Sequence, residues 1–167
     1  MIDTVDAREA VLNVARALRW VRETDGPNRG EVVDEMTREC GLRPPQPWCA
    51  AFLSFCGHAA LDLRWPLPLV AGCATLAEAA QAQGTLHVLT GGVVPERGAI
   101  FLLWGEAKQR YHHTGFVLGP DAEAGWFRCV EGNTNEDGSP EGTGVFTRRR
   151  RFGDKDAIIT WWTGGTV

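Results

Sequence analysis

The spacing of apolar residues changes near residue 84, and this change constrains the fold more than any other feature of the sequence. Before it, apolar residues recur every three or four positions, as in helices packed on one side. After it, short apolar runs are separated by turn residues, as in strands. The expected helices cover about Asp6–Glu23, Glu31–Cys40, Pro47–Ala60 and Thr75–Gln83, and the expected strands Leu86–Leu89, Gly98–Trp104, Thr114–Leu118, Trp126–Glu131, Gly144–Arg150 and Ala157–Trp162. We therefore predict an α+β fold, with N-terminal helices packed on one face of one antiparallel sheet of about five to six strands.

Size and charge exclude several classes of protein. The chain has 167 residues and a mass of 18.3 kDa, without repeats, linkers or low-complexity segments, so we expect a single domain spanning 1–167. The net charge of −4 gives no reason to expect a nucleic-acid partner. No apolar run approaches the length of a membrane span, so we expect no membrane partner.

The termini and cysteines bear on the compartment. The segment Met1–Asp6 is acidic and lacks the apolar stretch of a signal peptide. The five cysteines are odd in number and irregularly spaced, which does not indicate a disulfide framework. We therefore expect synthesis in the cytoplasm without a signal peptide.

The segment Pro47–Cys56, with the sequence PWCAAFLSFC, has a chemical property that the other helices lack. Proline is tolerated at the first helical position, and no breaker follows before Gly57, so we predict a buried helix that starts near Pro47. Cys49 would then lie in the first turn, where unpaired N–H groups and the helix dipole favour a thiolate. The alternative is a cysteine that only packs in the core.

A nucleophilic cysteine needs a base, and the base needs a group that orients it. His58 lies nine residues after Cys49 on the same helix, too far to reach its start. His112 and His113 open a strand, and because strand side chains alternate, only one of them can face the Cys49 helix. The next strand ends in Glu131 and Asn133, which share a face if the chain stays extended, and either could orient the histidine.

Four segments in this order resemble the CHAP domains, relatives of the NlpC/P60 cysteine peptidases, over about residues 40–162. They are Gly41-Leu42 with Pro47–Phe52, Pro95–Ala99 with Trp104, His113–Val117, and Glu131–Asn135. The resemblance implies a papain-like fold, a helical part over 1–45 and a catalytic core over 46–163. It places the catalytic residues at Cys49, His113, Glu131 and Asn133. Many members have Gly-Asp where this chain has Gly98-Ala99, a difference that we expect to be structural or peripheral.

The resemblance also implies an activity, which is hydrolysis of an amide bond in peptidoglycan. The bond is either in the wall peptide or between N-acetylmuramic acid and L-alanine. Cys49 would attack the carbonyl and His113 would transfer the proton. The Cys49 backbone N–H and one further donor would bind the oxyanion, and Gln46 is the nearest side-chain candidate. Trp48 is a candidate substrate contact, as an aromatic side chain beside the nucleophile.

Several alternatives remain open at the level of the sequence. The scaffold could be a binding or structural module with a degenerate site, or a cysteine amidase or deamidase that acts on a protein. The spacing Cys49-x6-Cys56-x-His58 is not a zinc pattern, so we expect no metal and no cofactor. The basic run Arg148–Arg151 is either a solvated sheet edge or a contact for anionic wall polymer.

Delivery to a cell wall would require either lysis or a dedicated secretion route. A phage-type lysin and a secreted antibacterial effector both fit this expectation, with peptidoglycan as the partner. An effector would in addition need an immunity protein as a partner.

Overall fold

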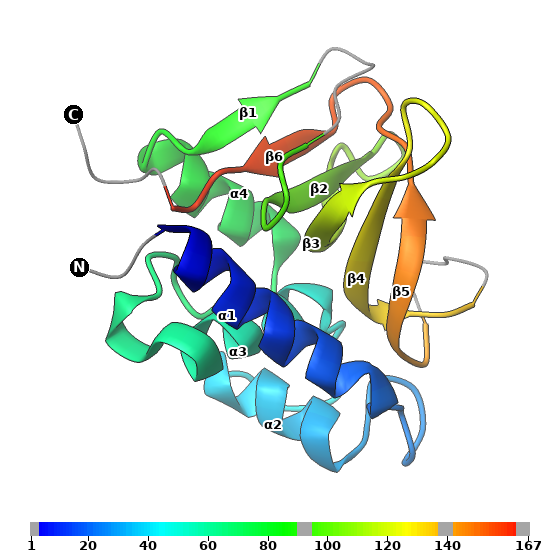
Figure 1. Cartoon of the computed structure of the whole chain (residues 1–167). Helices are drawn as coiled ribbons and strands as arrows, with labels where there is room; N and C mark the ends of the chain where they lie inside the picture. The colour runs from blue at the N-terminus through cyan, green and yellow to red at the C-terminus, as the bar shows by residue number, and fades with distance from the viewer. Residues whose placement is uncertain (1–3, 90–94, 137–141, 163–167) are drawn as a thin grey trace.

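The computed structural model describes residues 4–89, 95–136 and 142–162. Its helices are α1 (Thr4–Ala17), α2 (Glu31–Glu39), α3 (Cys49–Leu61) and α4 (Cys73–Ala82), with short 3₁₀ turns at Leu18–Trp20 and Asp62–Arg64. Its strands are β1 (Leu86–Val88), β2 (Ile100–Gly105), β3 (Arg110–Pro120), β4 (Phe127–Thr134), β5 (Gly144–Arg150) and β6 (Ala157–Ile159). The fold is α+β, with the four helices packed on one six-stranded sheet, as the sequence predicted (Figure 1).

The sheet has the strand order β1-β6-β2-β3-β4-β5, and every neighbouring pair is antiparallel. The consecutive strands β2 to β5 therefore form a meander, and β6 returns to fill the position between β1 and β2. The register shifts between Leu103 and Trp104, and again between Glu131 and Thr134. Such bulges bend a strand and redirect its side chains, and both lie next to the residues singled out in the sequence.

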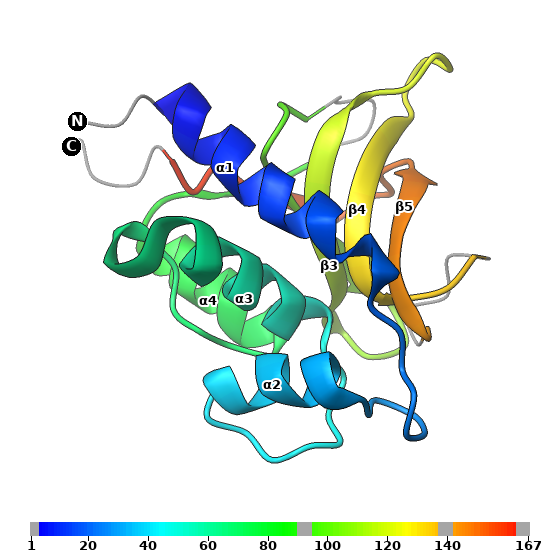
Figure 2. The same ribbon diagram turned by 60° about the horizontal axis from the view of Figure 1, so that its bottom comes forward.

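Helix α3 lies at the centre of the helical layer. Its residues are apolar on all sides, and nine of its thirteen are buried, as expected for a helix with neighbours all around it. Helices α1, α2 and α4 each contact α3, and α3 contacts β3 and β4. Figure 2 shows α1, α3 and α4 beside the sheet, with α2 packed on the outer side of α3. The position of the first turn of α3 is thus fixed from several directions.

The expected boundaries differ most from the structure at the end of the first helix and at the start of the third strand. The first helix ends at Ala17 rather than Glu23, because the chain turns at Leu18–Trp20 and then pairs with the edge of the sheet, where Arg22 bridges Gly144. The third strand begins at Arg110 rather than Thr114, because its first residues pair with the end of β2. No helix in the described ranges is both long and apolar enough to cross a bilayer.

Candidate active site

Cys49 is the first residue of α3, two residues after Pro47. Trp48 takes the N-cap position without a side-chain cap, and the first-turn N–H groups of a helix have no acceptor within the helix. The indole Nε1 of Trp48 donates to Glu23 Oε1 at 2.9 Å and ties this end of α3 to the segment after α1. Trp48 is fully buried, so its expected role as a substrate contact is wrong for the side chain.

Strand β4 passes very close to the first turn of α3. A Cβ placed on Gly132 would lie 2.6 Å from the Cβ of Phe52 and 2.9 Å from Cζ3 of Trp48. Real Cβ atoms do not approach each other so closely, so only glycine allows this packing. The glycine between Glu131 and Asn133 therefore sets how near the strand comes to the helix.

His113 and Glu131 are in direct contact on neighbouring strands. The His113 Nε2 atom and Glu131 Oε2 lie 2.8 Å apart, and both side chains are fully buried. The other ring nitrogen, Nδ1, is also buried and has no hydrogen-bond partner among the described residues. An imidazole held by a carboxylate through one nitrogen keeps the other free for proton transfer.

The Glu131 carboxylate is held as an anion. Arg150 Nε and Nη2 donate to its two oxygens at 2.8 and 2.6 Å, and Cys129 Sγ donates at 2.9 Å. Burial acts to raise the pKa of Glu131, but Arg150 and His113 outweigh it and lower that pKa to about 2. The expected solvated edge at Arg148–Arg151 is therefore wrong for Arg150, which is only 18% exposed. A two-pronged arginine–carboxylate pair fixes the orientation of both groups.

Gly115 makes room for this carboxylate. A Cβ at that position would lie 2.8 Å from Glu131 Cγ, 2.8 Å from Phe101 Cε1 and 2.7 Å from the Val130 carbonyl oxygen. The space beside His113 is thus occupied by the group that orients it. In this chain the glycine of the His-x-Gly pattern leaves room for Glu131 to contact His113.

Asn133 does not orient the histidine in this structure. The chain leaves the extended conformation at Asn133, where φ is +54°, within the β4–β5 register shift. The parity argument that put Glu131 and Asn133 on one face fails at this bulge. The Asn133 amide is buried, and neither of its polar atoms has a hydrogen-bond partner among the described residues.

The Cys49 thiol and the His113 imidazole affect each other, because a side-chain interaction and the charge of each group favour the ionised form of the other. Hydrogen bonding from Cys73 holds the pKa of Cys49 well below its usual range against the effect of burial, and His113 lowers it further. Burial opposes charge on His113, but Cys49 and Glu131 outweigh it and raise the pKa of His113 to about 9. Both shifts favour the thiolate–imidazolium form of the pair over the neutral form.

A second thiol lies beside the first. Cys73 is the first residue of α4, and its Sγ lies 3.5 Å from Cys49 Sγ. The segment before α4 is anchored to α3, because Ser54 Oγ donates to the Val70 carbonyl at 2.9 Å and accepts from the Val70 N–H at 3.0 Å. Sequence reasoning missed Cys73, because the fourth helix was expected to begin two residues later, at Thr75. A helix start placed at Cys73 would have put both thiols at helix N-termini.

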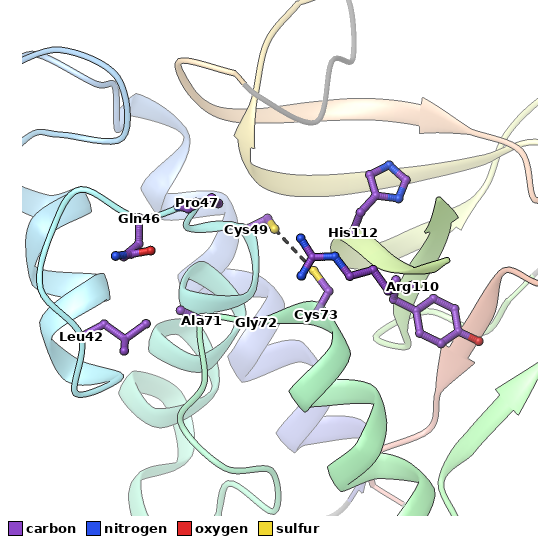
Figure 3. Close-up of a pocket in the computed structure, with 10 residues that line it drawn as sticks. Leu42, Gln46, Pro47, Cys49, Ala71, Gly72, Cys73, Arg110 and His112 are labelled. Carbon is purple, nitrogen blue, oxygen red and sulfur yellow. Dashed lines mark hydrogen bonds between the residues drawn. The ribbon is translucent and has the colours of Figure 1, made fainter. Parts of the chain in front are cut away.

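The two thiols lie at a surface pocket of about 370 Å³ (Figure 3). It is lined by Leu42, Gln46, Pro47, Cys49, Ala71, Gly72, Cys73, Arg110, Tyr111 and His112. Gln46 is exposed at the pocket, where its amide donates to the Arg43 carbonyl at 3.4 Å. The Arg110 guanidinium extends toward the two sulfurs from the hairpin side. Two helix N-termini and an arginine make this pocket electropositive.

His112 also lines the pocket, whereas His113 is fully buried and does not line it. Between Leu103↔His113 and Trp104↔Tyr111 the register shifts by one residue, and His112 is the extra residue of that bulge. Desolvation lowers the pKa of His112, and the charge of His113 lowers it further. His112 is therefore neutral at neutral pH.

Within residues 4–89, 95–136 and 142–162, no group of three or more His, Cys, Asp or Glu side chains is arranged to hold a metal ion. Cys49 lines the pocket, and the groups behind it in order are the His113 imidazole, the Glu131 carboxylate and Arg150, all buried or largely buried. A thiol, an imidazole and a carboxylate that orients it are the groups that nucleophilic cysteine catalysis uses.

Comparison with known proteins supports the fold. The structure resembles two crystal structures of Ly7917, one of them described with the hydrolyzing product of MDP, each with a TM-score of 0.53. Sequence identity is 14 and 15%, and the match covers 91% of this chain and 62% of theirs. The chain thus spans less than two thirds of the proteins it matches, and the likeness is one of fold. No protein-family model matches the sequence, and no curated protein matches it significantly.

Proposed function

We propose that this protein is a cysteine hydrolase that cleaves an amide bond in peptidoglycan. The observation that carries the proposal is the position of Cys49 at the first turn of α3, where it lines a surface pocket and interacts with the buried His113 that Glu131 holds. A cysteine that only packs in the core would need neither the charge pair nor the pocket. The same arrangement argues against a degenerate module.

In the proposed reaction, Cys49 Sγ attacks the carbonyl carbon, and the C=O electron pair moves onto oxygen. The N–H groups at the start of α3 lie where they can stabilise that charge, and Gln46 is a candidate for the second donor. His113 then protonates the leaving nitrogen, and the C–N bond breaks to give a thioester. Water, deprotonated by His113, hydrolyses the thioester and releases the Cys49 thiolate. Glu131 orients His113 throughout.

The choice of peptidoglycan rests on two kinds of support. The Ly7917 structure holds a product derived from MDP, muramyl dipeptide, which is a peptidoglycan fragment. Wall peptides carry carboxylates, and the pocket offers Arg110 and two helix N-termini to bind them. A lysin released by lysis or an antibacterial effector would both place such an enzyme at the wall, the latter with an immunity protein.

The proposal is tested by digesting purified peptidoglycan and measuring product masses. We expect the wild-type chain to release soluble fragments. New amino termini with intact muramyl links would define an endopeptidase, and free muramic acid carboxyl groups an amidase. Cys49→Ala should abolish release, because the nucleophile is lost at a helix start that suits a small residue.

The matched control is Cys56→Ala, two turns further along α3, which removes another buried thiol outside the pocket. It should release the same fragments as the wild type. Release by Cys49→Ala at the wild-type rate would refute the proposed mechanism. If the wild-type chain is inert on peptidoglycan but deamidates a protein substrate, the proposed cysteine mechanism stands and the proposed substrate is wrong.

A further inference from the structure

The contact between Cys49 and Cys73 goes beyond what acyl transfer needs. Their sulfurs are 3.5 Å apart, although 24 residues separate them in the chain. The sulfurs of a disulfide lie about 2.05 Å apart, so the two need to approach by only about 1.5 Å. Each cysteine is the first residue of its helix, where a small change in side-chain rotamer moves the sulfur without disturbing the helix.

The two thiols also differ chemically, because the pKa of Cys49 is lowered and that of Cys73 is raised. The Cys49 thiolate accepts the Cys73 S–H, which raises the pKa of Cys73 well above its usual range, and burial raises it further. Oxidation of Cys49 would remove its negative charge, and with it the hydrogen bond and the repulsion that raise the pKa of Cys73. The first turn of α4 and the charge of Arg110, which lowers the pKa of Cys73, would then favour its thiolate.

We propose that Cys49 and Cys73 form a reversible oxidation site, at which hydrogen peroxide converts the two thiols into a disulfide. The Cys49 thiolate attacks one peroxide oxygen, the O–O bond breaks, and protonation releases water and leaves Cys49 as a sulfenic acid. Cys73 attacks the sulfenic sulfur, the S–S bond forms, and the S–O bond breaks to release a second water. The two sulfurs together lose two electrons to the peroxide. An external thiol reverses the reaction.

The other cysteines do not compete for this role. Burial raises the pKa of Cys56 and Cys129 well above the usual range, and that of Cys40 to about 11, so each remains a thiol. None of these three lines the pocket that holds Cys49 and Cys73. The disulfide would block the nucleophile and protect it from oxidation to a sulfinic acid, which thiols do not reverse.

The inactivation rests on the proposed function, but the disulfide itself does not, and the experiment separates the two. The reduced full-length chain is treated with stoichiometric hydrogen peroxide and mapped by mass spectrometry without reductant. We expect one cross-linked peptide pair, containing Cys49 and Cys73 and lighter by two hydrogen atoms than the separate peptides. Peptidoglycan hydrolysis should fall with the cross-link and return with dithiothreitol.

Cys73→Ser and Cys40→Ser complete the test. After peroxide, Cys73→Ser should carry a sulfenic acid at Cys49, which dimedone traps as an adduct. Without dimedone, this sulfenic acid should proceed to the sulfinic acid, and dithiothreitol should no longer restore the activity. Cys40→Ser should cross-link like the wild type. Wild-type chains in which Cys49 reaches the sulfinic acid while Cys73 stays a free thiol would overturn the proposal, whether or not Cys73→Ser folds. A cross-link formed in a chain that is inert on peptidoglycan would sustain the oxidation site and refute the proposed function.

Discussion

Two adjacent histidines in β3 have different surroundings, and the difference predicts different effects when each is replaced. His113 is buried against Glu131, whereas His112 is a neutral residue at the pocket wall. A positioned general base contributes about 10²–10⁴-fold to a rate. We expect His113→Ala to lose about that much in peptidoglycan hydrolysis, and His112→Ala to stay within about tenfold of the wild type.

Alkylation gives a readout of the same pair that is independent of turnover. Iodoacetamide reacts with thiolates, and His113 helps to hold Cys49 as one. Labelling of Cys49 at neutral pH should therefore slow in His113→Ala and persist in His112→Ala, as followed by peptide mapping. If His112→Ala is instead the slow and inactive variant, the base is His112, one residue away from the position that the proposed mechanism gives it.

The alkaline limit of the activity should report His113. Its pKa of about 9 means that it loses its proton above that pH and can no longer protonate the leaving nitrogen. We expect kcat/KM to fall as the pH rises through about 9. In Glu131→Gln a neutral amide replaces the anion that raises this pKa, so the limit should move to lower pH. A limit that stays in place in this variant would show that another group titrates.

At the scale of elements, β4 packs closely against the first turn of α3, which begins with Cys49. In Gly132→Ala the new methyl group would overlap Phe52 and Trp48, and such overpacking costs about 1–3 kcal/mol. We expect a lower free energy of unfolding in urea and slower alkylation of Cys49. Gly153→Ala is the matched control, since its methyl group would lie 3.7 Å from Asp156 Oδ2, an ordinary contact. Equal stability of the two variants would contradict this packing argument.

Elements were predictable where one short-range signal decided them. The start of α3 followed from Pro47 and the apolar run, and β5 was expected with its observed bounds, Gly144–Arg150. The end of α1 was not, because pairing with a strand more than a hundred residues away overrides the helical periodicity near Arg22. A single sequence does not show such long-range pairing.

The same distinction applies to the site. The contact between His113 and Glu131 was one of the two alternatives expected, and both residues are still regularly paired in their strands, beside the bulges. Asn133 was misplaced because a bulge breaks the alternation on which the inference depended. Cys73 and Arg150 were missed because each contributes through a contact between separate elements. Cys73 contacts Cys49 between two helix ends, and Arg150 in β5 reaches Glu131 in β4.

For the whole molecule, the buried Glu131 links stability to pH. Its pKa is about 2 in the folded chain against a usual 4.5, so the stability that it contributes is fully present above 4.5 and is lost as the pH falls toward 2. We expect the melting temperature to drop steeply over this range. Glu131→Gln should be less stable near neutral pH, because Arg150 loses its counter-charge, but its melting temperature should depend less on acid. Parallel acid profiles for the two chains would contradict this.

The contacts Arg150–Glu131–His113–Cys49 run backwards along the chain, from a late strand to an early helix. During translation Cys49 therefore leaves the ribosome first, and Arg150, which fixes the carboxylate, leaves last of the four. Until β5 has docked, the histidine lacks its ordered partner and the thiol lacks its activated state. Under the proposed function, a nascent chain would thus carry an inert cysteine, and hydrolysis would begin only when synthesis of the sheet is almost complete.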